Sequence, residues 1–405
     1  MLSFETNAAR RTLVEFYDSE YLENIISLLY GNYSDVIYIY FARANEPTAQ
    51  DRKVLSEYIR KNFGFVPKFL EIPENTIDCA LKAFRYLVGD GGKYDFDITG
   101  GSSVFIAAAG ALAVGDGGKR IFLHEYDPVS GKQIFSYPEN IPTAKGRTAH
   151  LTVDHVLALR GIRILRPDQP IRYQLDRDDL RDQILRLWNT IRNDLKAWNS
   201  FSCIASNMER GHSFSFVDKL MNQEQRKNCN ILLKDLSKNG IISDLHEHKS
   251  NDKIKLSYRL NVPESALFLY EKGGNILEML TYLTSVNSGY FSDCCTGISL
   301  DWDNTSKYAR ANPYNEIDTV LTLGHIPYFI SCKNTDVTND YLYEIMVMAR
   351  HYGGKYAAAG LICTTKCNEH LHARAKEMGV VLIDDIAQLS ADAFLDRMIS
   401  NLCTK

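Results

Sequence analysis

The sequence lacks the long apolar runs that a membrane protein needs. No stretch of its 405 residues approaches the roughly 18 consecutive apolar residues of a transmembrane helix. The N-terminal stretch MLSFETNAARR also lacks the apolar centre of a secretory signal peptide. We therefore expect a cytoplasmic protein without a membrane partner.

The sequence has neither a regular cysteine pattern nor a strong charge bias. Its nine cysteines fall at irregular spacings, and an odd number without an export signal favours reduced, buried thiols. The pairs Cys294/Cys295 and Cys363/Cys367 lack the CxxC spacing of a zinc site. The formal net charge of −4 neither demands nor excludes a nucleic-acid partner.

What remains is the composition of a globular α/β protein with two or three domains. The first 165 residues alternate short hydrophobic strands with amphipathic helices, which is typical of a doubly wound domain with a parallel sheet. The strands are expected at 12–17, 35–42, 67–73, 93–99 and 119–126. The sequence GDGGK, at 89–93 and again at 115–119, indicates a glycine-capped helix end that is used twice.

One strand of this domain runs directly into a glycine loop, DITGGSS at 97–103. The loop lies at a strand's carboxyl end and at a helix N-terminus, where N–H groups and hydroxyls can bind phosphate or ribose oxygens. It lacks both the GxGxxG fingerprint and the P-loop lysine, so a nucleotide ligand is predicted without a nicotinamide enzyme or ATPase. A purely structural turn is the alternative. The candidate ligand-binding residues are Tyr17, Asp18, Ser19, Asp97, Thr99, Gly100, Gly101, Ser102 and Ser103.

Residues 166–175 contain two prolines and lose the strand rhythm, which indicates a domain boundary. The next segment, to about Asn261, is mostly helical and ends in a helix, a turn and a strand, the order of a winged helix. A phosphate-contacting wing and a basic face on a packing or dimerising connector are the two alternatives. The wing would carry Lys249, Lys253, Lys255 and Arg259.

The remaining residues predict a second α/β domain. Helices are expected at 275–286, 339–352 and 368–378 and at the C-terminus, with strands at 356–363 and 380–384. A hairpin, NEIDTVLTLGHIPYFISCKN at 315–334, turns near His325. Its register brings Asp318 beside Ser331 and Lys333.

A carboxylate beside a lysine and a backbone carbonyl can bind a hard divalent cation and orient an attacking water. Glu278 lies among apolar helical positions and needs a partner such as the same cation, and Glu344 is in a similar position. A cross-strand salt bridge is the alternative interpretation of Asp318 and Lys333.

The order Glu278, Glu316-Ile-Asp318, Ser331-Cys-Lys333, Glu344 resembles the PD-(D/E)XK nuclease superfamily. Together with Asp97-Ile-Thr99-Gly100-Gly101, it resembles the CARF-domain nucleases of type III CRISPR defence. The resemblance implies a Rossmann-like CARF sensor domain, a helical, winged-helix-like connector and a restriction-endonuclease-like α/β domain. Their expected ranges are 1–170, 171–264 and 265–405.

The resemblance also implies a function. In that family a cyclic oligoadenylate, usually cyclic tetra-adenylate, binds across a homodimer and activates a Mg²⁺- or Mn²⁺-dependent nuclease that cuts single-stranded or supercoiled DNA, RNA or both. It gives Asp318 the role of metal-binding aspartate, Lys333 that of motif lysine and Glu278 that of helical acid, while Cys332 offers its backbone carbonyl. Ser331 stands where the motif has an acid, so the number of cations is open, and Glu316 and Glu344 are candidates for the missing carboxylate. The alternative is a ligand-responsive, DNA-binding transcription regulator whose nuclease-like domain is inactive.

Overall fold

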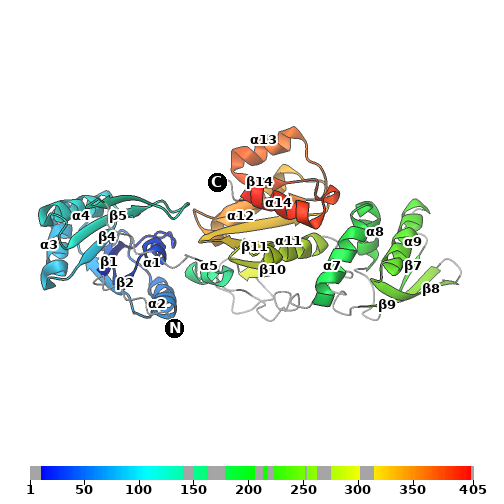
Figure 1. The fold of residues 1–405 in the computed structure, drawn as a ribbon, viewed down its shortest axis with the longest axis horizontal. Helices are drawn as coiled ribbons and strands as arrows, with labels where there is room; N and C mark the ends of the chain where they lie inside the picture. The colour runs from blue at the N-terminus through cyan, green and yellow to red at the C-terminus, as the bar shows by residue number, and fades with distance from the viewer. Residues whose placement is uncertain are drawn as a thin grey trace. The chain divides into compact units, whose positions relative to one another are not determined.

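The fold was analysed in a computed structural model (Figure 1). It describes residues 11–139, 150–162, 164, 178–205, 213–217, 223–250, 253–261, 275–301 and 314–402. Contacts divide the chain into two compact units. Unit 1 contains residues 1–163, 322–327 and 350–357. Unit 2 contains residues 164–321, 328–349 and 358–405.

Unit 1 contains a six-stranded sheet in the order β3-β2-β1-β4-β5-β6. Its strands are β1 (Arg11–Phe16), β2 (Tyr33–Phe41), β3 (Lys68–Ile72), β4 (Tyr94–Asp97), β5 (Ile121–Tyr126) and β6 (Gln133–Tyr137). The first five are parallel, which confirms the predicted doubly wound domain, and β6 is an antiparallel edge strand that the sequence did not predict. The strand order reverses between β1 and β4, so this sheet has a topological switch point there.

Most of the helices described in unit 1 start at side-chain caps. They are α1 (Ile26–Tyr30), α2 (Ala49–Phe63), α3 (Ile77–Leu87), the 3₁₀ turn η1 (Val88–Asp90), α4 (Ser103–Asp116) and α5 (Val153–Leu159). Thr48, Thr76 and Ser102 each accept a backbone N–H at a helix start. Gly91 and Gly117 follow η1 and α4 in the left-handed region, with φ of 83° and 63°, which confirms the two predicted glycine caps.

Unit 2 contains a five-stranded sheet in the order β10-β11-β12-β13-β14. Its strands are β10 (Asp293–Asp301), β11 (Tyr314–Leu323), β12 (Ile326–Lys333), β13 (Ala358–Cys363) and β14 (Val380–Ile383). Its helices are α11 (Asn275–Ser288), α12 (Asn339–Gly353), α13 (Glu369–Met378), the turn η4 (Ile386–Gln388) and α14 (Ala391–Leu402). The predicted hairpin and helices are confirmed, whereas β10 was not predicted.

The remaining elements of unit 2 lie in the range predicted as the connector. They are α7 (Asp178–Ile191), α8 (Leu195–Ala205), β7 (Ser213–Val217), α9 (Gln223–Lys238), β8 (Ile242–Ser250) and β9 (Lys253–Leu260). Its sheet has the order β7-β9-β8. The helix α9 and the strand β9 were predicted, whereas β7 was not and β8 begins in residues that were predicted to be helical. The predicted boundary at 166–175 lies outside the described residues, as do the side chains of Lys249, Lys253 and Lys255. Arg259 is exposed, with its Nε 3.9 Å from Asp244 Oδ2. Within the described part of the chain, no helix combines the length and apolarity that a bilayer span requires.

Candidate functional site

The predicted ligand residues lie at the switch point of the unit 1 sheet. β1 and β4 are neighbouring parallel strands, with Leu13 opposite Asp95. Tyr17–Ser19 follows β1 and 98–102 follows β4, so both segments leave the carboxyl ends of these strands. In open α/β sheets this is where small ligands bind. The structure therefore brings the two predicted segments to one edge, and their role in binding stays a prediction.

Two of these predicted residues hold the loop through hydrogen bonds, and a third is buried. Asp97 is fully buried and accepts hydrogen bonds from Ser27 Oγ and from the Thr99 N–H, the latter at 2.6 Å. Thr99 Oγ1 accepts the Tyr126 N–H at 2.8 Å. Tyr17 is buried, and burial raises the pKa of its phenol. The Asp97 and Thr99 side chains position the loop, which leaves its glycines and serines as the accessible part.

The accessible part of the loop has a backbone that only glycine can adopt at one position. Gly101 has φ of +104°, and a Cβ there would come within 2.9 Å of Phe16 Cβ. Ser102 caps α4 through Phe105 N–H, at 3.2 Å, and Ser103 is exposed. Ser19, after β1, is exposed too. Gly100, Gly101 and Ser102 are half-buried, and the segment 97–103 contains no lysine or arginine.

A buried charge network lies beside the loop, and it was not predicted from the sequence. His124 Nδ1 lies 2.7 Å from Asp95 Oδ1, and His124 Nε2 lies 2.8 Å from Ser27 Oγ. Burial alone would lower the pKa of His124, but the charges of Asp95 and Asp97 outweigh burial and raise it to about 10. Because both acids face a histidinium, their own pKa values are lowered despite burial. The register, which pairs Asp97 with His124, is the signal that could have revealed this network.

Glu15 of β1 extends this buried group. The residue is fully buried, and both carboxyl oxygens lack a hydrogen-bond partner among the described residues. Burial, together with the charge of Asp97, raises its pKa well above the ordinary value. Glu15 therefore favours the neutral acid, which avoids a second carboxylate charge next to Asp97.

The predicted acid–lysine pair lies in unit 2. Asp318 Oδ2 accepts the Cys332 N–H at 2.7 Å and the Ser331 hydroxyl at 3.0 Å. Lys333 Nζ lies 3.8 Å from the same oxygen and 5.0 Å from the centre of the Tyr341 ring. Two donors from β12 thus fix the carboxylate, and the aromatic ring helps to hold the ammonium.

Glu278 lies on α11, which contributes to the same region. Thr281 lies one turn after Glu278, and residues three apart share a helix face. The Thr281 Oγ1 lies 3.6 Å from Cys332 Sγ, so this face of α11 lies toward β12. The Cys332 thiol has a raised pKa because of burial, the Asp318 charge and the Glu278 charge, in that order. The structure therefore brings Glu278 into electrostatic range of Cys332, whose N–H binds Asp318. Cys332 itself is buried, so its backbone is the part that contacts the acid.

Glu316 and Glu344, the other two candidate acids, are both exposed. Glu316 is exposed and, two residues before Asp318, shares its side of β11. Glu344 is exposed on α12, one turn after Tyr341. Within the ranges that the structure describes, no three His, Cys, Asp or Glu side chains are grouped closely enough to hold a metal ion.

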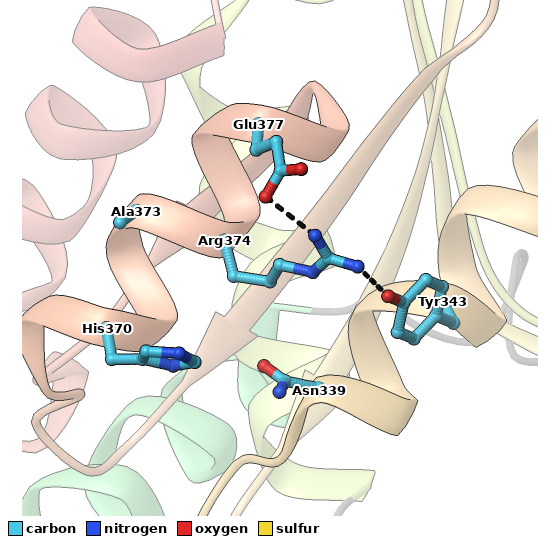
Figure 2. Close-up of a pocket in the computed structure, with 6 residues that line it drawn as sticks. All are labelled: Asn339, Tyr343, His370, Ala373, Arg374 and Glu377. Carbon is cyan, nitrogen blue, oxygen red and sulfur yellow. Dashed lines mark hydrogen bonds and ion pairs between the residues drawn. The ribbon is translucent and has the colours of Figure 1, made fainter.

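A separate pocket of about 360 Å³ lies between α12 and α13 (Figure 2). Arg374 extends from α13 toward the Tyr343 hydroxyl and the Glu377 carboxylate, and the latter lies at 2.6 Å. Arg374 and Glu377 are one turn apart on α13 and form a surface ion pair. The lining residues are Asn339, Tyr343, His370, Ala373, Arg374 and Glu377, so neither Asp318 nor Lys333 belongs to it.

The cysteines that the structure describes are free thiols, as predicted. Cys294 and Cys295 are buried in β10. Cys363 Sγ lies 3.5 Å from Cys367 Sγ, and burial raises the pKa of the Cys363 thiol. Both thiols of this pair therefore favour the protonated form.

No known protein family and no curated protein matches the sequence. Two solved structures share the fold over nearly the whole chain. Protein VC1899 from Vibrio cholerae is 18% identical, with a TM-score of 0.72, over 95% of this chain and 97% of that one. Can2 from Sulfobacillus thermosulfidooxidans, solved in complex with cyclic tetra-adenylate, is 15% identical, with a TM-score of 0.62, over 97% of this chain and 99% of that one. The predicted fold class is thereby confirmed.

Proposed function

We propose that the protein is a homodimeric nuclease of type III CRISPR defence, activated by cyclic tetra-adenylate and dependent on Mg²⁺ or Mn²⁺. The observation that carries the proposal is the 3.8 Å approach of Lys333 Nζ to Asp318 Oδ2, in a chain whose other sheet has a glycine loop at its switch point. The motif order supports it, as does the fold shared with Can2, which was solved with cyclic tetra-adenylate. We assign the sensor, connector and nuclease domains to 1–170, 171–264 and 265–405.

The donor set fits a hard divalent cation. Among the described residues, both hydrogen bonds to the Asp318 carboxylate end at Oδ2, so Oδ1 is the oxygen we assign to a cation. Glu278 supplies a second carboxylate in electrostatic range. Mg²⁺ and Mn²⁺ prefer oxygen ligands, and Mg²⁺ typically needs only one or two carboxylates because it keeps several waters. When bound, such a cation supplies charge stabilisation for the scissile phosphate and lowers the pKa of water.

The chain's own residues prepare the site for phosphodiester cleavage. The Cys332 N–H and the Ser331 hydroxyl orient Asp318, so the carboxylate needs little reorganisation when substrate binds. The Lys333 ammonium offers a positive charge to the phosphate oxygens, whose negative charge increases in the transition state. Single-stranded DNA, supercoiled DNA and RNA all contain the phosphodiester that this site would act on.

We assign the homodimer interface to α4, the helix that follows the ligand loop. This helix contains no charged residue before Asp116, and Val114 is 65% exposed. Spacings of three and four place its exposed apolar residues on one face. They are Ile106, Ala107, Ala111 and Val114. A second copy of this helix, related by two-fold symmetry, would bury the face and place two ligand loops around one cyclic ligand.

The test is cleavage of labelled single-stranded DNA, supercoiled DNA and RNA with Mn²⁺, with and without cyclic tetra-adenylate. We expect cleavage that requires the ligand, stops with EDTA and is lost in Asp318→Ala and Lys333→Ala. Asp392→Asn, which removes an exposed acid in the first turn of α14, is the matched control and should cut normally. Unchanged cleavage in both site variants would overturn the assignment.

The second candidate function is a ligand-responsive, DNA-binding transcription regulator, which the α9–β8–β9 order favours. It predicts ligand-dependent binding to duplex DNA without cleavage. An Arg259→Ala variant would then weaken duplex binding and reduce its salt dependence. Ligand-dependent cutting with unchanged duplex binding in this variant would exclude the regulator.

A further inference from the structure

The carboxylate of Glu23 lies between the predicted ligand loop and the segment that joins α12 to β13. A Cβ at Gly100 would come within 2.9 Å of Glu23 Oε2. Glu23 Oε1 accepts hydrogen bonds from the Tyr356 hydroxyl and from Lys355 Nζ, the latter at 3.2 Å. Gly100 and the Lys355 ammonium are therefore separated by a single carboxylate group.

The backbone that carries Lys355 is fixed by a second acid. Glu20 Oε2 accepts the Lys355 N–H at 2.8 Å. Gly354 has φ of +85°, and a Cβ there would come within 2.5 Å of Glu20 Oε1. Because glycine alone tolerates this conformation so close to another side chain, residues 354–355 are held against the segment that follows β1. The start of the Lys355 side chain is thus fixed, while its ammonium can change partners.

The two members of the pair differ in exposure. The side chain of Lys355 is 66% exposed, whereas that of Glu23 is 10% exposed. An ammonium of this kind can exchange its partner at little cost because water solvates it during the exchange. The hydrogen bonds to Tyr356 and Glu23 raise its pKa, so it remains a cation at neutral pH.

An anionic ligand at the loop needs such a cation. Each phosphodiester of a cyclic oligoadenylate carries one negative charge, and the segment 97–103 contains no lysine or arginine. Glu23, close to Gly100, repels an anion unless a positive charge compensates it. Lys355 is the cation that Glu23 already holds at this place.

We infer that Lys355 is a ligand-binding residue whose ammonium leaves the Glu23 carboxylate and pairs with a phosphate of the cyclic oligoadenylate bound at Thr99–Ser103. The inference rests on the proposed function. It adds a residue from the C-terminal part of the chain to the ligand site. Lys355 lies three residues before β13, and the last residue of β13, Cys363, is in register with Lys333. Lys355 is thus close in sequence to the strand that pairs with the strand of the motif lysine.

The test compares Lys355→Ala and Glu23→Gln in equilibrium binding of fluorescent cyclic tetra-adenylate to the full-length protein. We expect Lys355→Ala to raise Kd by about tenfold or more, the usual effect of losing a charge-assisted contact, and to reduce its salt dependence. Glu23→Gln removes the competing charge and should lower Kd. Lys355→Arg should keep most of the affinity, and Lys61→Ala, an exposed lysine at the end of α2, is the control.

The opposite signs of the two variants distinguish ligand exchange from a structural salt bridge. If Glu23 and Lys355 only fastened two segments together, both variants would weaken binding and lower Tm alike, and the inference would be wrong. Unchanged affinity in Lys355→Ala would also overturn it. Absence of binding to the unmodified protein would instead remove the proposed function, because that failure does not depend on Lys355.

Discussion

Asp318 and Lys333 face each other across the β11–β12 hairpin, with the lysine ammonium 3.8 Å from the carboxylate oxygen that also accepts the Cys332 N–H. The acid is thus oriented by its neighbouring strand, and no ligand is needed to bring the pair together. Such preorganisation is what a site for developing negative charge requires. The pair alone does not distinguish a nuclease from a sheet-edge salt bridge, so the predictions address its surroundings.

Ser331→Asp should increase the affinity of the site for Mn²⁺. The variant replaces the hydroxyl that donates to Asp318 Oδ2 with a carboxylate, which gives the site the acid that the motif normally has. A further oxygen ligand and negative charge favour a divalent cation. The half-saturating Mn²⁺ concentration for cleavage should fall several-fold, while Ser331→Ala should raise it or leave it unchanged. A higher half-saturating Mn²⁺ concentration for Ser331→Asp would contradict the assignment.

Glu278→Gln should reduce cleavage more than Glu344→Gln. Glu278 is close enough to Cys332 for its charge to help raise the thiol pKa, whereas Glu344 is exposed on α12. Loss of one catalytic carboxylate typically costs about 10²-fold or more in rate. The measurement is single-turnover cleavage at saturating ligand and several Mn²⁺ concentrations. Equal losses in both variants would indicate that Glu278 has no special role.

Val114→Glu should disrupt the proposed dimer. The residue is 65% exposed on the apolar face of α4, and two-fold symmetry brings two equivalent glutamates close together. We expect a monomer in sedimentation analysis and weaker ligand binding. Tyr86→Glu on α3 also introduces an acid, at a position that is 89% exposed, and is the control. An unchanged dimer in Val114→Glu would place the interface elsewhere.

The stability of unit 1 should fall as pH rises from about 6.5 to about 10. The folded pKa of His124 is about 10, above the ordinary 6.5, so the folded state binds a proton in this window that the unfolded state has released. Its stabilising contribution is complete below the unfolded pKa and is lost through the folded pKa, at up to about 1.4 kcal/mol per pH unit. Urea unfolding at several pH values measures it. A His124→Asn variant should be less stable at pH 6.5 and show a flatter profile.

The regular elements could be predicted because they are short apolar runs bounded by turn residues, or helices with one apolar face. The strand β1, with burial of Leu13 through Phe16, and the hairpin turning at Gly324–His325 follow from such local patterns. β10 was not predicted because its sequence, DCCTGISLD, mixes small, polar and apolar residues and shows no alternation. Such a strand is buried by the elements that pack against it, and its own sequence does not show this.

The candidate site also contains contacts that local sequence predicts and contacts that it does not. Asp318 and Lys333 are 15 positions apart on one hairpin, so strand geometry is enough to pair them. The Glu23–Lys355 contact joins residues 332 positions apart, and the partners of His124 come from two other elements, α1 and β4. Contacts of this kind depend on how strands and helices are ordered in space, which a single sequence does not specify.

The neutral carboxyl of Glu15 and the histidinium of His124 also make folding a proton-consuming reaction. Both groups have raised pKa values in the folded chain. Between the unfolded and folded pKa values, each takes up a proton from the solvent as unit 1 forms. The heat measured on folding must therefore contain the ionisation heat of the buffer, and calorimetry in phosphate and in Tris should give different apparent enthalpies at the same pH.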